Sequence, residues 1–256
     1  MKIEVCWGVT LLLVLGVSTC VPAQIVNIED QRKGFDTVGW YGQLDLGANL
    51  TRNQNTVVNL NGGLRVDRKG TDQALLALLD YQLVQINGDN AANAGFAHLR
   101  YAYYLSDVWR WEAFTQVQYN EQLRLGLRTL VGTGPRLKLL SFRNNRLYAG
   151  VLYMYEYDEV AERSIFYRDH RLSAYLSFSL FPLEGVSVSN TTYYQPVIPD
   201  FAMPRVSSIT AVSVRLTDRL AFNTKYSVTH DALLVQGLED VPATTYTWTN
   251  GLRYTF

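Results

Sequence analysis

Three histidines are the side chains of this sequence best suited to acid–base chemistry near neutral pH: His98, His170 and His230. A serine hydrolase built on strands would place a histidine and a serine close together on one strand, and none of the three shows that spacing. His230 is adjacent to Asp231, so on a strand their side chains would point to opposite faces. We therefore predict no catalytic residues and a protein that is not an enzyme.

Acidic residues raise the alternative of a metal site. Four of them share one predicted loop: Asp158, Glu159, Glu162 and Asp169. Carboxylates can bind calcium, but three arginines alternate with these four: Arg163, Arg168 and Arg171. Interleaved opposite charges favour a salt-bridged loop instead. Gly132 and Gly134 lack the Lys-Ser/Thr of a phosphate-binding loop, so we expect neither a metal nor a cofactor.

The first 23 residues have the pattern of a secretory signal peptide. Lys2 begins a short charged region, residues 9–17 are apolar, and Ala23 ends a plausible cleavage site. The apolar run is too short to cross about 30 Å of hydrocarbon, which argues against a membrane anchor. A lipid anchor would use Cys20, but Thr19 suits the position before a lipidated cysteine poorly. We expect Sec-type export, cleavage after residue 23 and a polar leader over residues 24–38.

Composition narrows the class of the exported chain. Both cysteines, Cys6 and Cys20, would leave with the signal, which excludes disulfides and thiolate chemistry. Lys plus Arg and Asp plus Glu number 23 each, so the chain offers no basic surface for nucleic acid. Seventeen Tyr, ten Phe and five Trp favour strands over helices. No later segment approaches about 18 consecutive apolar residues, which excludes a transmembrane helix.

Strict alternation of apolar and polar residues marks the clearest strands, at residues 109–119, 171–180 and 245–256. The apolar residues of the last strand are four aromatics and one leucine on a single row: Tyr246, Trp248, Leu252, Tyr254 and Phe256. Its aromatics stand at both ends, as expected of a strand that crosses the two interfaces of a bilayer. Strands of about 11 residues suit a tilted crossing.

Nine weaker segments complete a set of twelve strands: Trp40–Leu50, Thr56–Asp67, Ala74–Ile86, Ala94–Leu105, Gln122–Leu130 (extendable to Leu140), Arg146–Tyr157, Val186–Gln195, Val206–Leu216 and Leu220–His230. Compact connections alternate with connections that are mostly longer, such as 87–93, 158–169, 196–204 and 231–243. An even strand number brings both termini to the side of the compact turns. This pattern predicts an all-β fold over residues 39–256, a closed antiparallel up-and-down transmembrane β-barrel of twelve strands.

A soluble β-sandwich or ligand-binding barrel would turn its apolar rows inward. In this sequence the opposite rows carry Arg, Gln, Asn, Ser and Thr in nearly every strand, and the aromatics cluster toward strand ends. We therefore predict that the apolar rows face lipid, in the outer membrane of a Gram-negative bacterium.

Short motifs also carry a resemblance. They are Gly39-Trp40-Tyr41-Gly42 followed by Leu44, Leu46 and Gly47, then Asn55-Thr56, residues 101–109 (YAYYLSDVW) and Gly132-Thr133-Gly134-Pro135 before Arg136. With these motifs the chain resembles the salt-induced outer-membrane protein family, whose barrel is a domain of unknown function. Gln54 stands where that family has a glycine. The resemblance implies the barrel and the compartment. Phe256 also looks like the terminal signal read by the barrel-assembly machinery, which implies that machinery and outer-membrane lipid as partners.

If the apolar rows face lipid, a set of charged side chains faces the lumen: Asp45, Arg65, Asp80, Arg100, Arg110, Glu112, Arg124, Arg128, Arg215, Lys225 and Arg253. Arg146, Glu156 and Arg171 share this orientation. The excess is cationic, so a conducting lumen would favour anions. The alternative is that the charges pair across a filled lumen, because a buried charge is costly unless paired. The many long inward side chains favour a plugged or very narrow lumen.

The sequence thus predicts a non-enzymatic outer-membrane barrel with a structural or envelope role and, where its lumen is open, a narrow anion-biased passage for small polar solutes. Two other functions stay open. An outer-membrane lipid-modifying enzyme would show a cluster of hydroxyl, histidine and acid on one outward face. A soluble periplasmic ligand-binding barrel would be extracted from cells without detergent.

Overall fold

The computed structural model describes residues 37–160, 164–231, 233 and 241–254. These residues form twelve strands and one short 3-10 helix, η1. The elements are β1 (Gly39–Arg52), β2 (Thr56–Lys69), β3 (Gln73–Ile86), β4 (Asp89–Tyr104), β5 (Trp109–Asn120), η1 (Glu121–Leu123), β6 (Leu125–Phe142), β7 (Asn145–Val160), β8 (Ile165–Leu183), β9 (Val186–Gln195), β10 (Arg205–Arg215), β11 (Leu220–His230) and β12 (Thr244–Tyr254). The predicted signal peptide, most of the leader and Phe256 lie outside the described residues.

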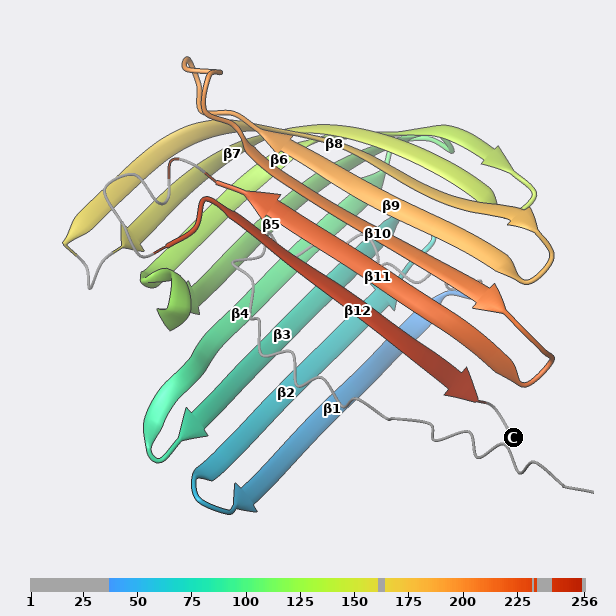
Figure 1. Ribbon diagram of the computed structural model, residues 1–256. Helices are drawn as coiled ribbons and strands as arrows, with labels where there is room; N and C mark the ends of the chain where they lie inside the picture. The colour runs from blue at the N-terminus through green and yellow to red at the C-terminus, as the bar shows by residue number, and fades with distance from the viewer. Residues whose placement is uncertain (1–36, 161–163, 232, 234–240, 255–256) are drawn as a thin grey trace, which may run out of the picture.

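Every strand pairs antiparallel with its neighbour in sequence, so the sheet order runs from β1 to β12 without a crossover. Figure 1 shows the strands tilted and curled together as one wall around an interior. This confirms the predicted all-β, twelve-stranded, up-and-down fold. β1 and β12 form the two edges of the sheet, and no ladder joins them in the described part of the chain. The closing contact between these edges therefore stays a prediction.

The connections differ from the sequence prediction on one side of the barrel. The turns that follow β2, β4, β6, β8 and β10 are compact, as predicted, and we call their side the turn end. At the opposite, loop end, only residues 196–204 and 231–243 are long. The expected loop over 87–93 contracts to Asn87 and Gly88, whose φ angles of 55° and 95° fit a tight hairpin turn.

Two other predicted regions also differ, because the strands are longer than the predicted crossing of about 11 residues. The expected loop over 158–169 contracts because β7 runs to Val160 and β8 begins at Ile165. β6 continues through Pro135, as one strand from Leu125 to Phe142. The longer strands carry additional side chains along the inner face.

Side chains alternate between the two faces of the sheet. In β5, Glu112, Phe114, Gln116, Gln118 and Asn120 are buried, and the residues between them are largely exposed. In β8, Arg171, Ser173, Tyr175 and Ser177 are buried, while Leu176 is exposed. The predicted polar rows therefore line the interior, and the predicted apolar rows cover the outer surface.

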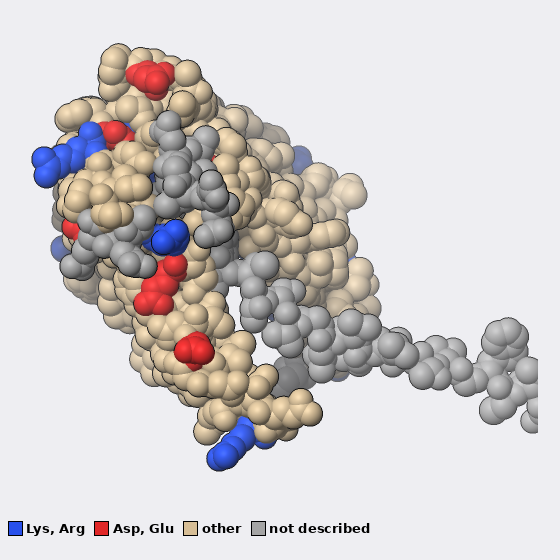
Figure 2. Space-filling view, turned by 60° about the vertical axis from the view of Figure 1, so that its left-hand side comes forward, with Lys and Arg blue, Asp and Glu red and all other residues tan. Residues whose placement is uncertain are grey.

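The outer surface is apolar over a wide area. Trp248, Leu252 and Leu176 expose 65%, 68% and 46% of their surface, although they are large hydrophobic residues. On the face shown in Figure 2, charged side chains form small separate patches. Exposed apolar area on this scale indicates contact with a membrane or with another protein. In the part of the chain that the structure describes, no helix is long and apolar enough to cross a bilayer.

The middle of the interior is filled by an apolar cluster of six buried side chains: Phe114, Leu130, Leu152, Met154, Tyr175 and Tyr193. Two glycines make room for its rings. A Cβ atom at Gly132 would lie 2.4 Å from Phe114 Cε1, and one at Gly150 would lie 2.2 Å from Tyr175 Cε1. The Gly132 and Gly134 pair thus serves packing inside a barrel wall.

Substituting Gly150 should therefore strain the interior. We expect Gly150→Val to reduce the free energy of unfolding by about 1–3 kcal/mol, since it overpacks against the Tyr175 ring. Urea unfolding followed by gel mobility would measure the loss. Gly251→Val is the matched control, because a Cβ atom there has no neighbour within 4 Å. Equal effects of the two substitutions would contradict this packing.

Candidate functional site

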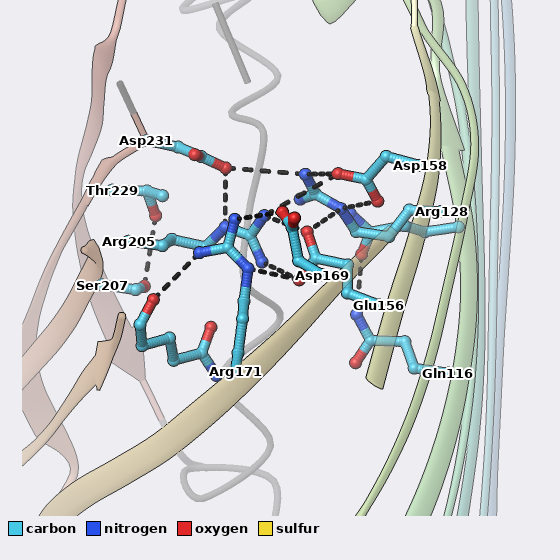
Figure 3. A network of polar contacts seen from close by, with 12 residues as sticks. Gln116, Arg128, Glu156, Asp158, Asp169, Arg171, Arg205, Ser207, Thr229 and Asp231 are labelled. Carbon is cyan, nitrogen blue, oxygen red and sulfur yellow. Dashed lines mark hydrogen bonds and ion pairs between the residues drawn. The ribbon is translucent and has the colours of Figure 1, made fainter. Parts of the chain in front are cut away.

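The loop-end side of the interior holds a buried network of charged residues, which we call the Glu156 network. Its members are Arg128, Glu156, Asp158, Asp169, Arg171, Arg205 and Asp231. They come from β6, β7, β8, β10 and the residue that follows β11. Figure 3 shows these side chains reaching toward one another from facing parts of the wall.

Arg205 lies at the centre of the Glu156 network and is 1% exposed. Its Nη1 and Nη2 atoms donate to the two carboxylate oxygens of Glu156 at 2.8 and 2.5 Å, a bidentate pair. Its Nε atom donates to Asp231 Oδ2 at 2.6 Å. β8 and β9 separate β7 from β10 in the sheet, so the Arg205–Glu156 pair spans the interior.

A second arginine repeats this arrangement from the opposite side. Arg128 donates from Nε and Nη2 to Asp158 at 2.8 and 2.6 Å, and its Nη2 lies 3.5 Å from Asp231 Oδ2. Asp231 therefore lies between two guanidinium groups. Burial raises the pKa of Asp231, but the charges of Arg205 and Arg128 outweigh that effect and hold it below the ordinary value.

Arg171 completes the network from β8. Its Nε atom lies 3.2 Å from Glu156 Oε2, and its Nη2 atom lies 3.3 Å from Asp169 Oδ2. Its Nη1 atom donates to the backbone carbonyl of Gln195 at 3.0 Å. Of the acidic stretch for which the sequence predicted a salt-bridged loop, Arg171 pairs with Asp169, while Arg168 lies over the Tyr157 ring. Glu162 and Arg163 lie outside the described residues.

A smaller set, the Glu112 cluster, lies on the other side of the apolar cluster and comprises Arg100, Glu112, Arg136 and Tyr175. Arg100 Nη1 donates to Glu112 Oε2 at 2.8 Å, and the Tyr175 hydroxyl donates to the same oxygen at 3.2 Å. Arg136 Nη1 lies 3.6 Å from Glu112 Oε1. Because Tyr175 stands on β8 and Glu112 on β5, this cluster also joins distant strands.

A small cavity lies between the Glu156 network and the Glu112 cluster. Its lining combines three arginines and five other polar residues with four members of the apolar cluster: Arg100, Arg128, Arg205, His98, Gln116, Gln118, Ser173, Gln195, Phe114, Leu130, Met154 and Tyr193. Gln195 is 4% exposed, and its Nε2 atom donates to Ser173 Oγ at 2.9 Å. The interior on this side of the barrel is therefore nearly filled, and ion pairs cross it on both sides of the apolar cluster.

Comparison with known protein families assigns residues 44–256 to "Protein of unknown function, DUF481". The chain belongs to the DUF481 family. This agrees with the resemblance to a barrel family of unknown function. A comparison with curated proteins finds no match.

Several solved structures of outer-membrane barrels are similar to this DUF481 chain. A NanC porin has a TM-score of 0.49 and 12% identity, covering 84% of this chain and 100% of its own. A KdgM porin has a TM-score of 0.43 and 9% identity, covering 85% and 98%. The β-domain of the Bordetella autotransporter BrkA has a TM-score of 0.36 and 13% identity, covering 85% and 98%. Likeness at this level adds nothing about solute or activity.

The predicted lumen charges fall into a buried and an accessible group. Arg65, Arg100, Glu112 and Arg128 are buried. Arg65 donates to its strand neighbour Asp67 at 2.5 Å from Nε, and the other three belong to the Glu156 network or the Glu112 cluster. The structure thus pairs the predicted residues Arg65, Arg100 and Arg128 with carboxylates on the same inner surface.

The remaining predicted charges lie closer to water. Asp45 and Asp80 flank Gly63, while Arg110 stacks over the rings of Tyr104 and Tyr148 at 4.4 and 5.9 Å. The others lie on the last three strands: Arg215, Lys225 and Arg253. Arg215 donates to Glu184 at 2.8 Å from Nη2. Of the predicted terminal-strand residues, Tyr246, Trp248, Leu252 and Tyr254 are exposed.

Arg124 departs from its expected place. It follows η1 with a left-handed backbone, φ 53°, and its backbone N–H donates to the Glu121 carbonyl. β6 begins only at Leu125, so Arg124 is exposed at the loop end and does not share the inward row of Arg128. The turn of η1 after Asn120 breaks the alternation that the sequence pattern assumed.

Arg136, Arg205 and Asp231 were absent from the predicted set of lumen charges. A signal existed for Arg136, which is an even number of positions from Arg128 on one strand. Arg205 similarly shares the row of Ser207 and precedes the predicted strand start by one residue. Asp231 lies just beyond β11 and has no such signal.

The histidines do not come together. His98 stacks between Phe96 and Phe114 inside the barrel. His170 contacts the Tyr153 hydroxyl on the outer face of β7 and β8, and His230 contacts Thr244 Oγ1 at 2.8 Å at the end of β11. Over the described ranges, no group of three or more His, Cys, Asp or Glu residues could hold a metal ion.

Proposed function

We propose that this chain is a non-enzymatic outer-membrane barrel that provides a narrow, anion-biased passage for small polar solutes. The outward apolar rows support placement in a bilayer, where strands satisfy their backbone hydrogen bonds within the sheet. The Glu156 network and the Glu112 cluster fill one side of the interior. Passage would follow the other side.

Inward residues near the sheet edges line this more open side. On β1 and β2, Gln43, Asp45, Asn59 and Asn61 are exposed even though they belong to the inward rows. On β12, Thr249 and Arg253 share that property. Exposed polar side chains on an inner surface fit a water-filled route beside a packed interior.

The observation that carries the proposed charge preference is a ring of cations at the turn end. Six strands contribute one inward cation each: Lys69, Arg110, Lys138, Arg146, Arg215 and Arg253. Arg215 and Arg253 are both paired in register with Ala221, so they flank the same position of β11. Several acidic residues at this end lie in the turns: Asp72, Asp107, Glu184 and Asp218. A ring of positive charge at a mouth favours entry of anions.

Planar-bilayer recording of the purified protein in a potassium chloride gradient tests this function. We expect single-channel steps with a reversal potential displaced toward the chloride equilibrium potential. Arg253→Gln should shift the reversal potential toward zero, because it removes one charge of the ring. Arg68→Gln is the control, since Arg68 lies outward over the Trp40 ring and should leave the reversal potential unchanged.

Three different results would overturn the passage, the anion preference and the membrane placement. No conductance above background would overturn the passage, and a cation-biased reversal potential would overturn the anion preference. Extraction of the protein from cells without detergent would overturn the membrane placement itself.

A further inference from the structure

The outer surface of β9 to β12 carries more polar side chains at its middle than the outward rows of β3 and β7. Six residues form this outer polar patch: Asn190, Thr192, Ser208, Thr210, Thr224 and Asn250. All belong to outward rows, since Thr191, Ser207 and Ile209 next to them are buried inside. Corresponding outward positions elsewhere carry Leu79 in β3 and Val151 in β7, which expose 50% and 48% of their surface.

Four of the six residues form one hydrogen-bonded group across β9 and β10. Asn190 Nδ2 donates to Ser208 Oγ at 3.0 Å and to Thr210 Oγ1 at 2.9 Å. Thr192 Oγ1 donates to Asn190 Oδ1 at 3.1 Å and lies 2.9 Å from Ser208 Oγ. Asn190 and Thr210 are in register, as are Thr192 and Ser208, so the four side chains form a compact square.

The other two residues extend the outer polar patch over β11 and β12. Thr224 Oγ1 donates to Asn250 Oδ1 at 2.7 Å, and Trp248 Nε1 donates to Thr224 Oγ1 at 2.8 Å. The register row of Asn190 and Thr210 continues into Tyr226 and Trp248, directly beside the row of Thr224 and Asn250. The outer polar patch therefore spans four strands, as two hydrogen-bonded groups on adjacent register rows.

The outer polar patch lies halfway along its strands. Asn190 and Thr210 lie at the middle of β9 and β10, farthest from both ends of the strands and, in a membrane, farthest from the interfacial water. Acyl chains offer no hydrogen-bond partner, so exposed hydroxyl and amide groups are unfavourable there. Between membrane segments, the same groups form hydrogen bonds that hold the segments together.

We propose that the outer polar patch is the surface through which two copies of this chain associate in the membrane, related by a two-fold axis. Hydroxyl groups both donate and accept, and a side-chain amide does the same, so the outer polar patch is complementary to itself. A two-fold contact requires this property, because the same surface serves both partners. The outer polar patch carries no charge that would call for an oppositely charged partner. The inference rests on the membrane placement in the proposed function, but not on the solute passage.

Light scattering of the detergent-purified protein tests the association through its molar mass. The wild-type chain should have the mass of a dimer. The triple variant Asn190→Leu/Ser208→Val/Thr210→Val should be a monomer that keeps its heat-modifiable gel migration, which reports a folded barrel. Thr115→Val/Thr129→Val removes outward hydroxyls from β5 and β6 and should stay a dimer.

The contrary results distinguish a failure of the dimer from a failure of the membrane placement. A heat-modifiable wild-type monomer, a triple variant that stays dimeric, or a mass that reveals a different bound protein would overturn the dimer and leave the membrane placement intact. A wild-type chain that is extracted without detergent would instead overturn the membrane placement on which the dimer rests.

Discussion

Arg205→Met is expected to destabilise the folded barrel by about 3–5 kcal/mol, the range found when one partner of a buried ion pair is removed. Arg205 is 1% exposed and binds Glu156 and Asp231 at once. Its loss would leave two buried carboxylates with fewer counter-charges. Urea unfolding of the protein in lipid vesicles, followed by the separation of folded and unfolded forms on gels, would measure the loss.

Arg215→Met is the matched control for this prediction. Arg215 also pairs with a glutamate, Glu184, but the side chains of the two are 47% and 93% exposed. Exposed pairs contribute about 0–1 kcal/mol, so the control should change stability little. The double variant Arg205→Met/Glu156→Leu should lose less than the two single variants added together, because the residues interact directly. A similar small loss for Arg205→Met and Arg215→Met would show that the Glu156 network does not hold the barrel.

Val151→Arg is expected to reduce the stability of the barrel in lipid by about 2–4 kcal/mol, the range for a cation at the bilayer midplane. Val151 lies on the outward row in the middle of β7 and is 48% exposed. On a surface exposed to water, the same substitution would change the stability very little. The size of the loss therefore reports whether the side chain is surrounded by lipid or by water. The same unfolding assay in vesicles measures it.

Leu183→Arg provides the comparison at a different depth. Leu183 ends β8 at the turn end and is 71% exposed. Near an interface the penalty falls to about 0–1 kcal/mol. If Val151→Arg and Leu183→Arg had equal effects in vesicles, the outward row of β7 would not lie in hydrocarbon.

Much of the fold was predictable because alternation is a local property of the sequence. The rows of β5 and β8 could be assigned to faces from residues such as Trp111, Glu112 and Leu176 alone, and the structure assigns them in the same way. Strand ends were harder to predict. Alternation weakens where outward residues such as Glu159 are charged as well, so Asp158 and Asp169 were assigned to a loop although they belong to β7 and β8.

The Glu156 network could be predicted only in part, for a different physical reason. The sequence indicates which face Arg128 and Glu156 occupy, but the distance across the interior depends on how the whole sheet curls. Arg205 and Glu156 are 49 positions apart and lie on strands that do not pair. Such a contact leaves no periodic signal. In the buried interior, carboxylates such as Asp231, which directly follows β11, pair with arginines.

The most direct test of the central claim is the alternation of environment along one strand. Nitroxide labels on single cysteines at positions 43, 44, 45 and 46 of β1 would report collisions with oxygen, which concentrates in hydrocarbon, and with a water-soluble nickel chelate. The two native cysteines lie in the predicted signal peptide, so the exported chain would carry one label. We expect oxygen contact at Leu44 and Leu46, and nickel contact at Gln43 and Asp45. The reverse pattern, or equal water access at all four positions, would contradict an apolar exterior in lipid around a polar lumen.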